Sequence, residues 1–177
     1  MRLFIALDLP AGVRAELAAW ADAAAPPEVR RVPAENLHVT LAFLGSRSGD
    51  EAAAARALLP ALARPLGDLV TAGALWLPPR RPGVLSVALA ADEALAALHE
   101  ELVAALAEAI GFVPERRRLR PHVTVGRVRR EARIDTRRVF DPPAPELRFP
   151  ARSVVLYRSR TAPDGARYER LGGAELR

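Results

Sequence analysis

The sequence predicts an α+β fold with two similar lobes, in which two antiparallel sheets face a central cleft and helices pack outside. Three observations support this prediction. Strand-like segments joined mostly by turns alternate with amphipathic helices, which is typical of α+β proteins. The triplet His-Val-Thr occurs once in each half of the chain, each time on a predicted strand. A length of 177 residues with 50% hydrophobic content is enough for one compact domain, spanning residues 1–177.

The first part of the chain alternates strand, helix and strand. Residues 2–9 form an apolar run that we expect to be a buried strand ended by Pro10. Residues 11–24 carry apolar side chains at helical spacing, and the Pro26-Pro27 pair stops this helix. Residues 37–44 alternate and are rich in β-formers, so they predict a strand that contains the first triplet.

The middle of the chain predicts a hairpin between two helices. Residues 50–64 are alanine-rich and helical, with Ser48 or Asp50 as the cap. Residues 72–77 and 84–90 read as two strands joined by a proline-rich turn, which predicts an antiparallel hairpin. Residues 92–110 form the clearest helix, because a leucine stripe runs between a capping aspartate and Gly111.

The last third predicts strands around a long loop. Residues 122–128 form the strand of the second triplet, and residues 153–158 and 166–171 form two more, separated by the Pro163-Asp164-Gly165 turn. Residues 129–150 lack periodicity and are rich in arginine and proline, so we expect a long loop there.

Composition narrows the function classes. The chain has no cysteine, so a disulfide framework, a zinc knuckle and a thiol nucleophile are excluded. No histidine or carboxylate cluster has metal-ligand spacing, and we expect neither a metal nor a cofactor. The apolar run 3–7 is too short for a signal-peptide core, and no segment has the length of a membrane span. We therefore expect a cytoplasmic protein that does not bind membranes, and a monomer.

Positive charge is concentrated around the second triplet. The net charge is +5, and every basic residue is arginine. Between residues 112 and 138 ten arginines face three carboxylates, a local charge of +7. These arginines are Arg116, Arg117, Arg118, Arg120, Arg127, Arg129, Arg130, Arg133, Arg137 and Arg138. Such a concentration indicates a site for a phosphate polyanion, although a solvated loop would look the same.

The triplets place an imidazole beside a hydroxyl. Side chains two residues apart on a strand point to the same side, so His38 shares a face with Thr40, and His122 shares one with Thr124. A single copy would more often be a structural pair. With two copies on lobes related by a pseudo-twofold axis, both imidazoles can face one cleft.

Two imidazoles in one cleft suit acid-base chemistry at phosphorus. An imidazole titrates near pH ~6.5, so one ring can be protonated while the other is neutral. One would take a proton from a hydroxyl or water, and the other would protonate the leaving oxygen. Thr40 and Thr124 would donate to the non-bridging oxygens, and Arg127 is the nearest arginine that could balance negative charge.

Strict strand alternation poses a problem for this site. Arg127 and Phe43 each lie five residues after a motif histidine, which places them on the opposite strand face. Either side chain reaches the cleft only if its strand bulges, twists or ends. Gly126 and Gly45 are well placed to allow this.

The two motifs resemble those of a known superfamily. The segments His38-Val-Thr-Leu-Ala-Phe43 and His122-Val-Thr-Val-Gly-Arg127 are similar to the HxTxxF and HxTxxR motifs of the two-histidine phosphoesterases. The chain most resembles the RNA 2',3'-cyclic phosphodiesterases, also called 2'-5' RNA ligase-like proteins. The similarity covers most of the chain. It includes the opening Arg-Leu-Phe-Ile-Ala-Leu strand, the Arg-Pro-His lead into the second motif, and the closing Leu-Tyr-Arg-Ser strand with its Gly-Ala-Arg-Tyr-Glu continuation.

The resemblance implies a bilobal fold, no metal, and hydrolysis of a terminal RNA 2',3'-cyclic phosphate to a 2'-phosphomonoester. It makes His38 the general acid for the departing 3' oxygen and His122 the general base for water. It also implies phosphate contacts and a stacked terminal base. Those contacts would come from Thr40, Thr124 and Arg127, with Phe43 on the base. From the residues alone, either histidine could be the acid.

Other side chains carry weaker signals. Arg120, Tyr157 and Arg158 are candidates for contacts with RNA, because Arg120 precedes the second motif and the other two lie on a predicted strand. His99 lies beside the leucine stripe of its helix, and we expect it at the boundary of the core with no catalytic role. Trp20 and Trp76 are expected in the core.

Alternative functions remain open at this point. The same cleft could join RNA ends through a 2'-5' linkage, or act on another small cyclic or 2'-5' linked nucleotide. A protein of another class, a non-catalytic module that binds RNA ends, would use the arginines and keep the histidines only as phosphate ligands. In a purely structural domain, the triplets would be relics of duplication.

Overall fold

The computed structural model describes residues 1–114, 118–162 and 165–176. These residues form three α-helices, a short 3-10 helix and nine strands. The helices are α1 (Ala11–Ala24), α2 (Gly49–Leu62) and α3 (Glu93–Ile110), and the 3-10 helix is η1 (Ala34–Asn36). The strands are β1 (Arg2–Asp8), β2 (Val29–Arg31), β3 (His38–Ser46), β4 (Asp68–Leu77), β5 (Val84–Leu89), β6 (His122–Val128), β7 (Arg148–Pro150), β8 (Ser153–Ala162) and β9 (Gly165–Glu175).

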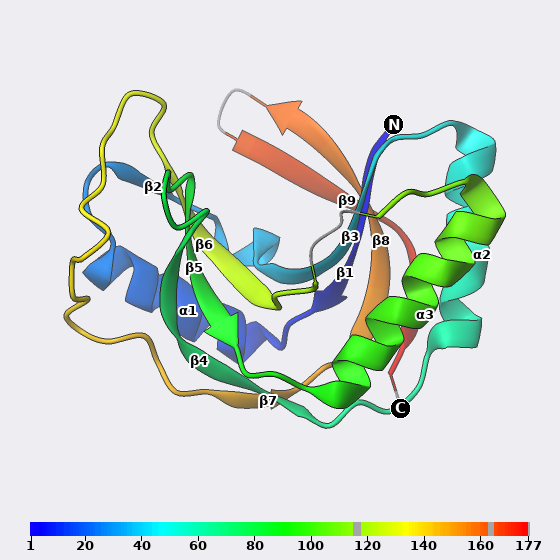
Figure 1. The fold of residues 1–177 in the computed structure, drawn as a ribbon, viewed down its shortest axis with the longest axis horizontal. Coiled ribbons are helices and arrows are strands. Elements are labelled where there is room, and N and C mark those ends of the chain that lie inside the picture. Colours follow the sequence, from blue (N-terminus) through cyan, green and yellow to red (C-terminus); the bar gives the residue numbers. More distant parts are fainter. Residues whose placement is uncertain (115–117, 163–164, 177) are drawn as a thin grey trace.

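The strands form an antiparallel sheet in two halves. Its order is β7-β4-β5-β6-β3-β1-β8-β9, and β2 pairs with the far end of β6. The two motif strands, β3 and β6, are paired at one position, Val39 with Val123. The two expected sheets are therefore present as two halves joined at this pair, and Figure 1 shows the halves diverging from it.

The helices cover the outer sides of the two halves, as predicted. Helix α1 packs against β2 and β6 in one half. Helix α2 packs against β8 and β9 in the other half, and α3 lies against α2. Figure 1 shows α1 on one side of the molecule and the α2 and α3 pair on the other. This arrangement leaves the motif-bearing strands in the middle of the fold.

Local signals explain where the helices begin and end. Ser48 caps α2 in a reciprocal capping box with Glu51, whose backbone N–H donates to the serine hydroxyl at 3.1 Å. Asp92 caps α3 through the Leu95 amide at 2.6 Å. Gly111 ends α3 with φ of 60°, a left-handed conformation that favours glycine. The caps expected at Ser48 and Asp92 and the stop at Gly111 are confirmed.

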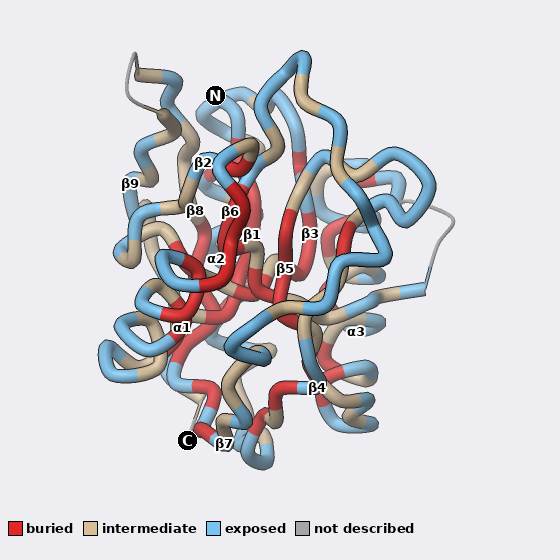
Figure 2. The backbone as a smooth tube through the Cα atoms, turned by 90° about the vertical axis from the view of Figure 1, so that its left-hand side faces the viewer, coloured by how far each residue is buried: buried red, intermediate tan, exposed pale blue. Residues whose placement is uncertain are grey.

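The core lies between the sheet and the helices. The leucine stripe of α3 is buried, and so are Trp20 and Trp76, which are 5% and 7% exposed. Figure 2 shows the buried positions concentrated along β1, β3, β5 and β6, while the loops around them are exposed. The motif strands are therefore held on their inner face by a continuous hydrophobic core.

The sequence predictions were incomplete at several places, among them the start of β4, which begins at Asp68 and not at residue 72. Strand β2 was missed because its three residues have no pattern of their own and gain their partners from β6, about 100 residues later. The expected loop 129–150 is wrong at its end, where β7 pairs with β4. Strands β8 and β9 pair with each other beyond the predicted ranges. Pro163 and Asp164 of the expected turn lie outside the described residues.

Candidate active site

The two motifs have the same pattern of exposure. From His38 to Phe43, and again from His122 to Arg127, the order is half-buried, buried, half-buried, buried, buried, exposed. In both strands the histidine and threonine lie on one face, and the intervening valine is buried. The second motif is thus a structural copy of the first.

A bulge in each strand solves the alternation problem. In β3, Thr40 pairs with Ala6 and Ala42 with Ile5, so Leu41 is an extra residue. In β6, Thr124 pairs with Ser86 and Gly126 with Leu85, so Val125 is the extra residue. One extra residue reverses the alternation beyond it. Phe43 and Arg127 therefore return to the face of their histidines, as the sequence required.

The ring of His38 is held from both nitrogens. Its Nδ1 lies 2.7 Å from the carbonyl oxygen of Asn36, and its Nε2 lies 3.0 Å from the hydroxyl of Thr40. A carbonyl oxygen only accepts hydrogen bonds, so Nδ1 carries the proton. In the neutral ring, Nε2 is then the acceptor and Thr40 donates to it. Nε2 of His38 and the Thr40 hydroxyl are thus hydrogen-bonded to each other.

Aromatic rings surround His38 on its other sides. The ring centroid of Phe4 lies 4.8 Å away, and that of Tyr168 lies 5.3 Å away in an edge-on arrangement. Burial among these rings lowers the pKa of His38, because burial disfavours the charged imidazolium. The Asn36 carbonyl and the Asp8 carboxylate oppose this shift, while Arg127 and His122 reinforce it. Both Arg127 and His122 therefore act electrostatically on His38.

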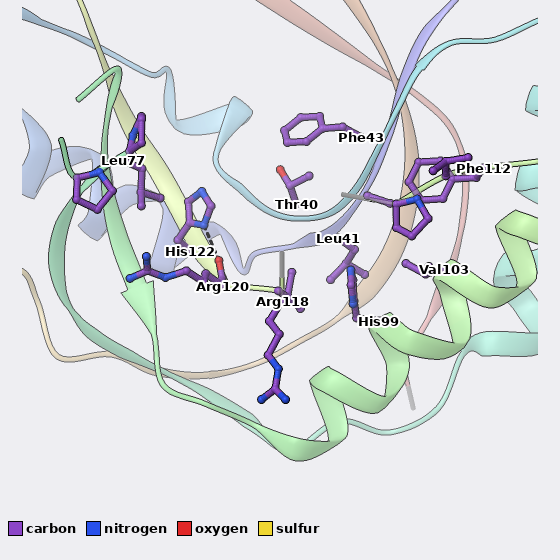
Figure 3. Close-up of a pocket in the computed structure, with 16 residues that line it drawn as sticks. Thr40, Leu41, Phe43, Leu77, His99, Val103, Phe112, Arg118, Arg120 and His122 are labelled. Carbon is purple, nitrogen blue, oxygen red and sulfur yellow. Dashed lines mark hydrogen bonds between the residues drawn. The ribbon is translucent and has the colours of Figure 1, made fainter. Parts of the chain in front are cut away.

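His122 has the matching orientation. Its Nδ1 lies 2.6 Å from the carbonyl oxygen of Arg120, the contact drawn as a dashed line in Figure 3. In both motifs, therefore, the carbonyl two residues before the histidine orients the ring and leaves Nε2 for chemistry. The hydroxyl of Thr124 lies 3.4 Å from that of Ser86, a fully buried residue.

A pocket of about 340 Å³ opens beside the motifs. Figure 3 shows Thr40, Phe43 and His122 at one side and helix α3 at the other. Its walls are largely apolar side chains and prolines, with a few polar groups. The polar side chains among the lining residues are Thr40, His99, Arg118, Arg120 and His122. A flat apolar ligand with a charged end matches this lining.

The predicted phosphate and base contacts lie around this pocket. Phe43 lines the pocket and is 66% exposed, which is unusual for a phenylalanine side chain. Arg127 is exposed at the end of the β6 motif, and His38, Thr124 and Arg127 are not among the pocket-lining residues. His38 contacts Phe4 of β1, whereas Thr124 and Arg127 lie on β6, which pairs with β5 and β2. The pocket and the two histidines thus form adjoining parts of one site.

Two weaker candidates from the sequence lie on β8. The Tyr157 hydroxyl donates to the carboxylate of Asp8, and burial together with this contact raises the pKa of the tyrosine. Tyr157 also stacks on Phe4, so it supports the ring that contacts His38. Arg158 follows on the opposite strand face, where its guanidinium lies 3.9 Å from Glu169.

Sequence reasoning missed two residues next to His38. Asp8 pairs with His38 in the β1 and β3 register, and its carboxylate lies 3.5 Å from the Arg170 guanidinium. Tyr168 reaches the His38 ring from β9. The only signal for Asp8 was a carboxylate at the end of a buried strand, while nothing in the sequence linked Tyr168 to a motif 130 residues earlier.

His99 lies where the pocket reaches α3. It is half-buried, as expected for the core boundary, and burial lowers its pKa.

Within the described ranges no group of three or more histidine, aspartate or glutamate side chains could hold a metal ion. In the same part of the chain no helix is long and apolar enough to cross a membrane.

Comparison with known proteins agrees with this geometry. The family model of the 2'-5' RNA ligase superfamily matches residues 9–163. The RNA 2',3'-cyclic phosphodiesterase of Escherichia coli K12 is 30% identical over 181 residues, which cover 96% of this chain and 93% of that protein. The protein of the same name from Methanocaldococcus jannaschii is 25% identical over 184 residues, with 96% and 97% covered.

The fold is also similar to solved structures. The crystal structure of E. coli LigT complexed with 3'-AMP superposes with a TM-score of 0.78 at 30% sequence identity. The match covers 99% of this chain and 97% of that one. The similarity therefore extends over both halves of the sheet and over the site between them.

Proposed function

Because the chain belongs to the 2'-5' RNA ligase superfamily, we propose that it hydrolyses RNA ends that carry a 2',3'-cyclic phosphate to 2'-phosphomonoesters. The main observation behind this proposal is a pair of imidazoles on two paired strands, β3 and β6. In each case the backbone carbonyl two residues earlier orients the ring in the same way. The names of two relatives support the reaction class. In this proposal no metal ion takes part.

The two histidines divide the proton transfers. His122 takes a proton from water through Nε2 while the water oxygen forms a bond to phosphorus. The bond between phosphorus and the 3' oxygen breaks, and His38, which enters this step as imidazolium with a proton on each ring nitrogen, gives that oxygen the proton from Nε2. The products are a 2'-phosphate and a free 3' hydroxyl. At the end of the step His122 has gained a proton and His38 has lost one. Proton exchange with solvent then restores both rings to their starting states.

The neighbouring polar groups hold the phosphate. Thr40 is 3.0 Å from Nε2 of His38, so its hydroxyl can turn from the ring to a non-bridging oxygen when substrate arrives. Thr124 occupies the equivalent place beside His122, and Arg127 supplies positive charge from the exposed end of the motif. Fixed donors of this kind stabilise the charge that develops on phosphorus oxygens in the transition state.

The terminal nucleoside fits the apolar pocket. Phe43 presents an exposed ring next to Thr40, and most of the other lining residues up to α3 are apolar. Bases of any kind stack on aromatic rings, because every base has a π face. We therefore place the terminal base against Phe43, with its cyclic phosphate toward the two histidines.

The test uses a short RNA that ends in a 2',3'-cyclic phosphate, incubated in EDTA. The wild-type protein is expected to release a 2'-phosphate end, and His38→Ala and His122→Ala should each lose most turnover while remaining folded by circular dichroism. Loss of a general acid or base typically costs about 10²- to 10⁴-fold. Arg137→Ala is the control, since its side chain is 91% exposed, belongs to neither motif and does not line the pocket.

Other outcomes separate the alternatives. A 3'-phosphate product would contradict the proposed acid and base positions. Turnover that disappears in EDTA and returns with a divalent ion would contradict the metal-free mechanism. A folded wild-type protein that binds the RNA end without turnover would favour a binding module. Joining of a 5'-hydroxyl RNA to the cyclic end would show that the same site also runs in the ligation direction.

A further inference from the structure

A second crevice adjoins the pocket of about 340 Å³ beside the motifs, which we call the catalytic pocket. Its volume is about 440 Å³, within the range of roughly 300–1,000 Å³ typical of ligand sites. It lies between β4 and the arginine-rich loop, defined here as residues 129–147. Its lining residues are Ala74, Leu75, Trp76, Pro79, Arg120, Thr136, Arg138, Val139 and Phe140. Pro79 and Arg120 also line the catalytic pocket, so the two spaces share a wall.

The shared wall ties this crevice to the chemistry. The backbone carbonyl of Arg120 orients His122 at 2.6 Å, and the Arg120 side chain borders both spaces. Figure 3 shows Arg120 next to His122 at the side of the catalytic pocket. An RNA strand that runs from the two histidines past Arg120 would therefore enter the second crevice directly.

The crevice is positively charged. Arg120 and Arg138 line it, Arg118 lines the adjoining pocket, and the described residues that line either space include no carboxylate. Within the described ranges no salt bridge involves Arg120 or Arg138. Unneutralised guanidinium groups beside a low-dielectric wall attract phosphate.

The loop that carries Arg138 is anchored to the rest of the protein. Phe140 packs between Trp20 and Trp76, with ring centroids 5.6 Å from each. The Trp20 indole donates to the Pro142 carbonyl at 2.9 Å, and the Thr71 hydroxyl donates to the Pro145 carbonyl at 2.7 Å. Figure 1 shows this loop running along the outer side of the half that contains β4 and β5. These contacts hold Arg138 at the crevice.

We propose that this crevice binds the phosphodiester that precedes the terminal nucleotide, through Arg120 and Arg138. The inference rests on the proposed function, since it assumes that the cyclic phosphate lies between the two motif histidines. The inference narrows the substrate class: the protein should prefer the end of an RNA oligonucleotide over a free nucleoside 2',3'-cyclic phosphate. A mononucleotide has no phosphate on its 5' side and leaves the crevice empty.

The test compares kcat/KM for three substrates: adenosine 2',3'-cyclic phosphate, the dinucleotide ApA with a 2',3'-cyclic phosphate, and the same dinucleotide with a neutral methylphosphonate linkage. We expect the charged dinucleotide to exceed the mononucleotide by about 10-fold or more, and the advantage to decrease with salt. The methylphosphonate should lose most of the advantage, because it keeps the second nucleoside but removes the charge.

Two neighbouring arginines provide a matched pair of variants. Arg138→Ala should reduce the ratio of dinucleotide to mononucleotide kcat/KM by about 5-fold or more. Arg137→Ala removes the same charge from the adjacent position, where the side chain is 91% exposed and does not line the crevice, and it should keep the wild-type ratio. Equal ratios for the two variants would overturn the proposal.

The inference and the proposed function fail in different ways. If wild-type protein hydrolyses mononucleotide and dinucleotide equally well, the upstream phosphodiester site is wrong while the phosphodiesterase activity stands. If the methylphosphonate keeps the full advantage, the second nucleoside and not its phosphate is recognised, which also overturns the proposal. If neither cyclic phosphate is hydrolysed, the proposed function fails and this inference fails with it.

Discussion

Val39 lies directly opposite Val123, and this is the position at which the two halves of the sheet are joined. Both valines are fully buried. Because the strands are antiparallel, the residue after Val39 faces the residue before Val123. Thr40 and His122 therefore share one end of the pair, and His38 and Thr124 share the other. The two motifs are thus related by the antiparallel pairing at Val39 and Val123, which is the arrangement expected for a pseudo-twofold site.

This symmetry leaves the acid and base roles to be assigned by chemistry. We predict that replacing the 3' oxygen of the cyclic phosphate by sulfur restores turnover by His38→Ala and leaves His122→Ala inactive. A thiolate leaves without protonation, so the general acid becomes dispensable while the general base does not. The measurement is kcat for both variants on the oxygen and sulfur substrates. Rescue of His122→Ala instead would reverse the two roles.

The exposed ring of Phe43 predicts a defect in binding and none in folding. Phe43→Ala should lower kcat/KM for the cyclic phosphate by about 10-fold or more, because stacking of a base on an aromatic ring contributes roughly 1–3 kcal/mol. With the ring 66% exposed, the free energy of unfolding should change by less than about 0.5 kcal/mol. Phe43→Trp should keep activity. An unfolding defect with normal kcat/KM would identify Phe43 as a structural residue.

Gly126 predicts a defect of the opposite kind. A Cβ atom at this position would lie 2.3 Å from Cγ1 of Val29, on the strand that crosses the end of β6. Gly126→Ala must push β2 away, and overpacking of this kind costs about 1–3 kcal/mol. Arg127 follows directly, so activity should fall as well. The measurement is urea unfolding together with kcat/KM.

Gly12 provides the control for that substitution. A Cβ atom there meets nothing within 4 Å, and the residue lies in the first turn of α1. Gly12→Ala should therefore leave activity unchanged and stabilise the protein by up to about 1 kcal/mol, because alanine loses less backbone entropy in a helix. If Gly126→Ala behaved like Gly12→Ala, the close approach of β2 would have no energetic importance.

Local patterns predicted the elements that carry the site. Helices α2 and α3 follow their capping residues, and both His-Val-Thr segments lie on strands with the expected faces. Strand alternation predicted that Phe43 reaches the cleft only if its strand bulges, twists or ends, and the structure has the bulge. The extra residue is Leu41, four positions before Gly45, the glycine that the sequence suggested.

What the sequence could not predict depends on long-range pairing. Asp8 affects His38 only because β1 and β3 pair in a register that sets these residues side by side. Tyr168 reaches the same ring only because β9 extends beside β8, and β8 beside β1. No local pattern encodes such contacts. Burial lowers the pKa of His38 and the Asp8 carboxylate raises it, and the motif by itself encodes neither effect.

That protonation predicts a pH dependence of stability. Burial lowers the pKa of His38 in the folded protein below the value of about 6.5 expected for the unfolded chain. Between these two values the unfolded chain binds more protons than the folded protein. The free energy of unfolding therefore rises with pH in this window, and stability is lost as the pH falls from 7 through 6.5 toward the folded pKa. Replacing His38 by glutamine should make this loss smaller.

Substitutions of the charged neighbours should change this loss in opposite directions. Asp8 raises the pKa of His38 and Arg127 lowers it, so Asp8→Asn should deepen the loss of stability at acid pH and Arg127→Ala should reduce it. Urea unfolding at pH 5 to 7 measures this, and the same substitutions in the His38→Gln background isolate the part due to the ring. If both substitutions have the same effect with and without the imidazole, the charges act on stability independently of His38. Opposite shifts that vanish with the imidazole would show that Asp8 and Arg127 set the protonation of the acid proposed for the reaction.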